Sequence, residues 1–440
     1  MNILELILRK VFRFIEFIGM VLFRVLQKIY FGEEEEKSVL KFLSKFSRYP
    51  DLLLKPFNSS ILLYPLRISV RRFGALSHYV LVPIITGIYI LLGLVSNIPF
   101  PFMKELELGV LIWIAATAIY LVGSWFGEKI SSSLRPININ PISLAYFSLP
   151  IMLLGLLGLI YNYATIGAVP LLNPELRRHN LLWMVSYDTY LLFSAVFLAS
   201  LAKASEEGKI SKGFLYEISS AVLLITAVIT FPSGFRLDVF VALITLLIVL
   251  WSYRIIKART MVFYLLIPLA IAFVGQKYIL TVKAGTPADP LYIVVSRAGF
   301  TLYALSLIIK HFSWTGLSYG KLIFINPLLT MLGVPRLLIG PFLGKVIVGL
   351  PEAYTSSFVG PLWADFGVVG IVVVPLMIGG LTGIFYRLSR SRNPIFTAFY
   401  SILTTAMLVW IESGPVHPYL YLLYLFALLL LPLMVKKCNN

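Results

Sequence analysis

Residues 366–386 read FGVVGIVVVPLMIGGLTGIFY and contain no Asp, Glu, Lys or Arg. About 20 apolar residues in a helix cross a hydrocarbon core of about 30 Å, so this stretch predicts a membrane-spanning helix. Within it, Gly379 and Gly383 form a GxxxG motif, which predicts close packing against another helix.

Apolar runs of similar length recur along the 440 residues, of which 59% are hydrophobic and 13% charged, with a mean hydropathy of +0.90. Such a chain cannot cover a water-facing surface, which excludes the soluble and fibrous classes. Because the runs are long enough to cross the membrane as helices, we predict an all-α, polytopic membrane helix bundle.

Hydropathy along the whole chain predicts about 12 transmembrane helices. The segment 321–343 is interrupted by Pro327, Pro335 and Arg336, so a re-entrant or interfacial segment is the alternative there. The predicted spans are 79–97, 106–126, 142–162, 183–203, 214–232, 236–252, 260–280, 293–310, 321–343, 366–386, 395–411 and 418–435.

The 37 Lys and Arg residues exceed the 20 Asp and Glu residues, which gives a net charge of +17. In a soluble protein this excess would suggest nucleic acid, but here it falls in alternate loops, as the positive-inside rule predicts for the cytosolic side. We therefore expect no nucleic-acid partner and a multi-pass protein of the cell membrane with both termini in the cytosol. The predicted cytosolic loops contain Lys129, Arg135, Lys209, Lys212, Arg254, Lys257, Arg259, Lys310, Lys321, Arg387, Arg390, Arg392, Lys436 and Lys437.

Three regions follow from this topology. Residues 1–78 form a cytosolic N-terminal region, in which charged residues at helical spacing along 3–30 predict an amphipathic helix lying in the membrane interface. Residues 79–435 form the transmembrane domain, and residues 436–440 form a cytosolic tail. The larger outer loops are expected near 163–182, 281–292 and 344–365.

Five arginines remain on the predicted outer side, where the positive-inside rule does not explain them. Asp238 follows Arg236 by two residues in a tight turn between apolar spans, so a structural ion pair is one interpretation of Arg236. Other interpretations are a solvated loop for Arg177 and Arg178 and, for Arg336, a side chain that reaches the interface. Together the five favour a polyanionic ligand, since guanidinium groups bind phosphate oxygens in a bidentate manner. They are Arg177, Arg178, Arg236, Arg297 and Arg336.

Acid and base groups are also expected on the outer side. A group that removes a proton from an acceptor hydroxyl is needed for glycosyl transfer. Glu105 and Glu107 resemble a metal-binding acidic pair but read better as solvated loop charges, and Cys438 is the single cysteine. We therefore expect no metal site and no cofactor. The candidate catalytic residues are Asp365, Glu352, Glu412 and His417.

Two stretches, taken with a third between them, resemble a known family. Residues 163–172, YATIGAVPLL, contain a G-x-x-P-L-L pattern and are followed by Arg177. Residues 354–370 form a Thr/Ser-rich turn that leads into D-F-G-x-x-G, and residues 233–236, SGFR, lie between the two. This order resembles the Wzy-type oligosaccharide repeat unit polymerases, also called O-antigen polymerases, over about residues 160–415.

The resemblance implies a membrane glycosyltransferase that is inverting and metal-independent. Its substrate would be an oligosaccharide carried on a lipid of the polyprenyl or dolichyl pyrophosphate type, joined to a second glycan at the outer face of the membrane. Arginines of such enzymes engage the phosphates, which would correspond to Arg177, Arg236, Arg297 and Arg336 here.

Two alternatives remain open. A flippase or transporter of lipid-linked glycans also needs many spans and a basic cavity, but it predicts charges near the membrane midplane and two-half symmetry. A related glycosyltransferase or ligase would keep the same residues and change only the substrate. In each case membrane lipids surround the protein, and a flippase or a chain-length regulator is a candidate partner.

Overall fold

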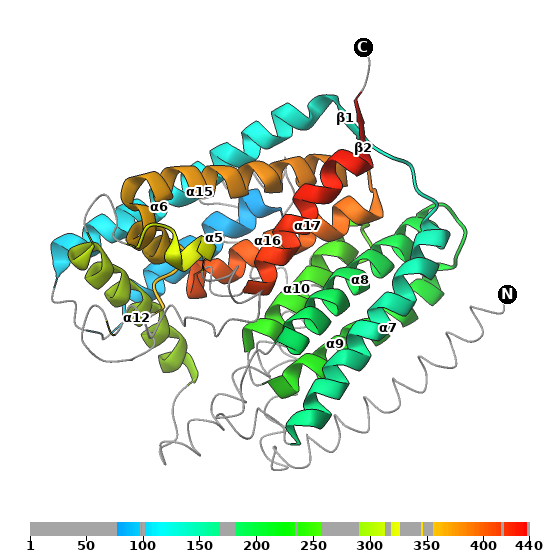
Figure 1. The fold of residues 1–440 in the computed structure, drawn as a ribbon, viewed down its shortest axis with the longest axis horizontal. Coiled ribbons are helices and arrows are strands. Elements are labelled where there is room, and N and C mark those ends of the chain that lie inside the picture. The colour runs from blue at the N-terminus through cyan, green and yellow to red at the C-terminus, as the bar shows by residue number, and fades with distance from the viewer. Residues whose placement is uncertain are drawn as a thin grey trace, which may run out of the picture.

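The computed structural model describes residues 77–96, 98, 102–167, 181–233, 236–256, 290–312, 318–325, 345, 355–414 and 418–437. These residues are almost entirely helical (Figure 1). In chain order the helices and strands are α5 (His78–Leu94), α6 (Met103–Ile130), η2 (Ser131–Ser133), β1 (Leu134–Pro136), α7 (Pro141–Ile166), α8 (Leu181–Glu206), α9 (Lys212–Thr230), η4 (Phe231–Ser233), α10 (Arg236–Ser252), α12 (Pro290–His311), η5 (Lys321–Ile325), α15 (Val359–Ser389), α16 (Pro394–Ser413), α17 (Pro418–Met434) and β2 (Val435–Lys437).

Ten of the twelve predicted spans coincide with one of these helices. Six of the described helices, α6, α7, α8, α9, α15 and α16, are long and apolar enough to cross a membrane. The chain is therefore a multi-pass membrane protein. The predicted span 260–280, most of 321–343 and the predicted interfacial helix within 3–30 lie outside the described residues, so the total of about 12 stays a prediction.

Helix α16 forms the centre of the bundle, with α5, α8, α10, α15 and α17 packed around it (Figure 1). Its apolar window is 94% buried, whereas that of α7 is 28% buried. Large apolar side chains such as Leu111, Leu154 and Met377 are exposed on α6, α7 and α15. In a membrane these side chains face lipid, so the outer helices contribute the apolar surface that the bilayer requires.

The GxxxG motif of α15 packs against α6, as the sequence predicted. A Cβ atom added at Gly379 would overlap the carbonyl oxygen of Tyr120, and one added at Gly383 would overlap that of Ser124. Gly127 of α6 meets the backbone of α15 in the same way. The two backbones thus approach as closely as small residues allow, and this contact fixes α15 against α6.

Replacing Gly383 by Ala is expected to destabilise the protein by about 1–3 kcal/mol, because the two backbones must separate to admit the methyl group. Thermal unfolding in detergent would measure the effect. Gly87→Ala is the matched control, since nothing lies within 4 Å of a Cβ atom at that helical position. Equal melting temperatures for the two variants would contradict the close packing.

One end of the bundle, called here the basic end, collects arginines and lysines from several loops. Arg392 forms an ion pair with Glu206 at the end of α8, and its carbonyl oxygen accepts a 2.9 Å hydrogen bond from Tyr253, just after α10. Strands β1 and β2 pair at this end, with Arg135 opposite Lys436. The opposite end is called the far end. Five of the six basic loops predicted to be cytosolic have described residues at the basic end.

The start of α5 is also fixed at the basic end by a buried polar cluster. The His78 ring contacts the hydroxyl groups of Ser124 on α6 and Tyr400 on α16. Next to it, Tyr79 donates a hydrogen bond to Glu128. Residue 78 and residue 437 therefore lie at the same end of the bundle.

Helix α12, at the predicted span 293–310, lies across the far end of the bundle (Figure 1). Leu302 packs on Gly93, the penultimate residue of α5. The Lys310 ammonium lies 3.4 Å from the centroid of the Phe102 ring, directly before α6. Helix α5 ends and α6 begins at the far end, so Leu302 and Lys310 of α12 both lie at that end.

The sequence predicted Lys310 and Lys321 in a cytosolic loop, on the same side of the membrane as Lys129. The structure instead places Lys310 beside Phe102, at the end of the bundle opposite to Lys129. The physical reason is that Leu305, Ile308 and Ile309 of α12 are buried against other helices of the protein. Hydropathy counts such residues as it counts lipid-facing ones, so it cannot separate a protein-buried helix from a span.

Candidate functional site

The D-F-G-x-x-G stretch of α15 builds part of the far end. Gly367 has φ 57° and ψ −136°, which breaks α15 into a short first segment and a long second one. This backbone conformation is open to glycine and costly for other residues. The long segment begins where the sequence predicted the span 366–386, and Asp365 lies two residues before the break.

Asp365 holds the neighbouring chain segment in place. Its Oδ1 accepts a hydrogen bond from the backbone N–H of Leu322 at 3.1 Å, and its Oδ2 accepts one from Ile323 at 2.8 Å. The side chain is fully buried. Asp365 therefore fixes η5 against α15, and both of its oxygens are occupied by backbone donors.

Replacing Asp365 by Ala is expected to leave two buried backbone N–H groups without acceptors, at a cost of about 1–3 kcal/mol each. The melting temperature of the variant in detergent should fall by several degrees. Glu217→Ala removes a carboxylate from an exposed position on α9 and should leave the melting temperature unchanged. A wild-type melting temperature for Asp365→Ala would contradict the bracing role.

Arg297 and Glu412 meet at the far end although 115 residues separate them. Arg297 lies in the first part of α12 and Glu412 in the last turn of α16, and the Nε of Arg297 donates to Oε1 of Glu412. The two side chains are 45% and 26% exposed. In the described part of the chain no carboxylate other than Glu412 pairs with Arg297, and nearly half of the Arg297 side chain is exposed.

Tyr89 and Thr301 lie beside the Arg297–Glu412 pair, and the sequence analysis did not single them out. The buried Tyr89 hydroxyl of α5 lies next to Arg297 and Thr301. Thr301 donates a 3.0 Å hydrogen bond to the carbonyl oxygen of Arg297. No sequence signal joins α5, α12 and α16, because only the folded chain brings these residues together.

A second polar group lies at the far end between α8 and α10. Tyr187 donates a 2.5 Å hydrogen bond to the carbonyl oxygen of Asp238, and its ring stacks on Trp183 with centroids 4.7 Å apart. The Asp238 side chain is fully buried, and the Asp188 carboxylate lies close enough to interact with it. Asp188 is 7% exposed, and among the described residues neither of its oxygens has a hydrogen-bond partner. A buried carboxylate of this kind is costly, which makes Asp188 a functional candidate.

Several predicted site residues are not placed by the structure. Arg236 begins α10, two residues before Asp238, but only its backbone is described. Among the described residues no group of three or more His, Cys, Asp or Glu side chains could hold a metal ion. The predicted residues outside the described part are Arg177, Arg178, Arg336, Glu352 and His417.

Comparison with protein families decides the identity of the chain. The model of the family described as "Putative O-antigen polymerase" matches residues 75–424. The chain belongs to this family. The match covers every described helix except the last part of α17, and it confirms the resemblance that the motifs indicated.

Two curated relatives of this O-antigen polymerase family member come from Methanocaldococcus jannaschii. The uncharacterized protein MJ0419 is 27% identical over 286 residues, which are 64% of this chain and 75% of that protein. The uncharacterized protein MJ0420 is 26% identical over 301 residues, which are 67% of this chain and 66% of that protein. No solved structure matches. The family, rather than a characterised relative, therefore carries the functional argument.

Proposed function

We propose that this protein is an inverting, metal-independent glycosyltransferase that polymerises lipid-linked oligosaccharide repeat units at the outer face of the membrane. Its membership of the O-antigen polymerase family and its membrane-spanning helices support an enzyme of this kind. The observation that carries the proposal is the Arg297–Glu412 pair, which presents a half-exposed guanidinium group beside a carboxylate at one end of the bundle.

The charges of the two ends support the outer-face location. Basic residues gather at the cytosolic side of membrane proteins, so the basic end is the proposed cytosolic side. The far end, with Arg297 and Glu412, then faces outward. The lipid tail of the substrate would remain in the membrane while its pyrophosphate reaches this end.

The proposed reaction is a single displacement. A hydroxyl group of one glycan attacks the anomeric carbon of another, the bond to the lipid pyrophosphate breaks, and the configuration inverts. Arginines at the far end would stabilise the charge on the departing pyrophosphate. This role is proposed for Arg297 and Arg236, and for Arg177, Arg178 and Arg336 of the predicted outer loops.

A general base must accept the proton of the attacking hydroxyl. Of the two described candidates, Glu412 is better suited than Asp365, because it is partly exposed while both oxygens of Asp365 accept backbone hydrogen bonds. Glu352 and His417 remain candidates in the same role.

Purified full-length protein, incubated with lipid-linked oligosaccharide in detergent and a metal chelator, tests the proposal. We expect a ladder of extended glycans with the anomeric configuration inverted at each new linkage. Intact substrate in the presence of folded protein would contradict the enzyme. Movement of the lipid across proteoliposome membranes without extension would favour the flippase instead.

A further inference from the structure

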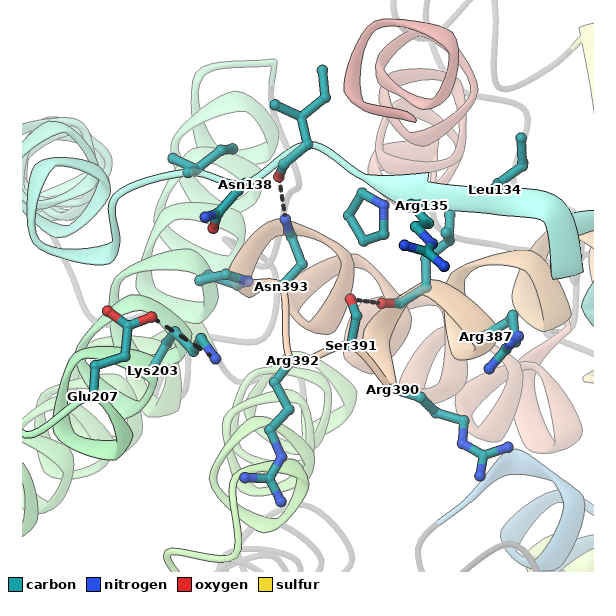
Figure 2. Close-up of a pocket in the computed structure, with 15 residues that line it drawn as sticks. Leu134, Arg135, Asn138, Lys203, Glu207, Arg387, Arg390, Ser391, Arg392 and Asn393 are labelled. Atoms are coloured by element: carbon teal, nitrogen blue, oxygen red, sulfur yellow. Dashed lines mark hydrogen bonds and ion pairs between the residues drawn. The ribbon is translucent and has the colours of Figure 1, made fainter. Parts of the chain in front are cut away.

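A cavity of about 710 Å³ opens at the basic end, away from the proposed catalytic site (Figure 2). It lies between the connection from α6 to α7, the end of α8 and the connection from α15 to α16. Binding sites for small molecules commonly measure about 300–1,000 Å³. The cavity is thus large enough for a ligand with several polar groups.

The lining is strongly basic. In Figure 2, Arg135, Arg387 and Arg390 lie on one side of the view, and Lys203 lies with Glu207 on the other. Five cationic side chains line the cavity, Arg135, Lys203, Arg387, Arg390 and Arg392, whereas Glu207 is the single acidic residue in the lining that the structure describes.

The nearby carboxylates are already engaged. Glu207 lies 3.8 Å from the Lys203 ammonium and 2.6 Å from that of Lys209. Glu206 pairs with Arg392. No carboxylate in the described ranges pairs with the three arginines that remain, Arg135, Arg387 and Arg390. Like charges around one hollow repel each other, and a bound anion would relieve that repulsion.

The walls are held by specific contacts. The Asn393 side-chain amide donates a 3.0 Å hydrogen bond to the carbonyl oxygen of Ile137, which ties the two connecting loops together. The pairing of β1 with β2 fixes Arg135, and the hydrogen bond from Tyr253 fixes the backbone of Arg392. The positive-inside rule explains the sign of these charges, but it requires neither a hollow nor braced walls.

We propose that this cavity binds a phosphate-rich anion carrying at least two phosphate charges. Guanidinium groups bind phosphate oxygens in a bidentate manner, and basic pockets between membrane helices on the cytosolic side accept anionic lipid headgroups. The ligand is either such a headgroup or a soluble phosphate compound. The inference is independent of the proposed polymerase activity, because no far-end residue takes part.

Binding to the purified full-length protein in nanodiscs tests the proposal in two arms. In the first, inorganic pyrophosphate is titrated by calorimetry into protein in phosphatidylcholine nanodiscs. In the second, cardiolipin retained by the protein is counted by native mass spectrometry. Binding of pyrophosphate indicates a soluble ligand, and retention of cardiolipin alone indicates a lipid headgroup.

The double variant Arg387→Gln/Arg390→Gln should weaken the observed binding at least tenfold, since two charge-assisted contacts are lost. The matched control is Lys212→Gln/Arg254→Gln, which removes two exposed charges from the same end but outside the cavity. The control should retain wild-type affinity. Equal losses in the two double variants, or no binding of either probe by the wild-type protein, would overturn the proposal.

Discussion

Replacing Arg297 by Gln is expected to reduce glycan extension by about 10²- to 10³-fold, the loss typical when one donor to a developing charge is removed. The Arg297 side chain is 45% exposed and pairs with Glu412 through Nε, so we expect its exposed part to meet the departing pyrophosphate. Rates measured with saturating lipid-linked oligosaccharide would show the effect. Arg254→Gln, the same change at the basic end, should keep wild-type activity.

A purely structural role for the Arg297–Glu412 pair makes a different prediction. Removing one partner would then leave an unpaired charge and lower the stability of the protein. Removing both charges would restore its stability and its activity. The double variant Arg297→Gln/Glu412→Gln separates the two cases. We expect it to regain thermal stability but to remain inactive, and recovered activity would contradict phosphate binding by Arg297.

Replacing Arg236 by Lys is expected to reduce extension by about 10- to 100-fold, because a compact ammonium cannot supply the paired donors of a guanidinium group. Arg236 begins α10, close to the buried Asp238. Initial rates and thermal unfolding should be measured together. If the residue serves only an ion pair with Asp238, the lysine variant should keep full activity, and that outcome would rule out the proposed role.

The sequence predicted the apolar helices well, because every helix that crosses the lipid bilayer requires a long apolar run. The apolar run predicted the start of the long segment of α15 after Gly367, and the GxxxG motif predicted the packing of Gly383. The position of α12 across the far end of the bundle was not predicted. Its buried residues, such as Leu305, read as lipid-facing until the structure showed them against the protein.

The site was less predictable than the fold. The sequence singled out Arg297 as an arginine on the predicted outer side and Glu412 as a candidate base, but their direct contact depends on tertiary structure. Tyr89 has an apolar ring and an ordinary position in α5, so nothing in the sequence marked it. Asp365 was a candidate base because it lies on the predicted outer side, whereas the structure shows its carboxylate accepting hydrogen bonds from the backbone of Leu322 and Ile323.

A cryo-electron microscopy map of the full-length protein with bound lipid-linked oligosaccharide would test the central claim most directly. The account predicts pyrophosphate density at the far end, within hydrogen-bond distance of Arg297 and close to Glu412. Pyrophosphate density confined to the basic end, with Arg297 contacting only Glu412, would contradict it.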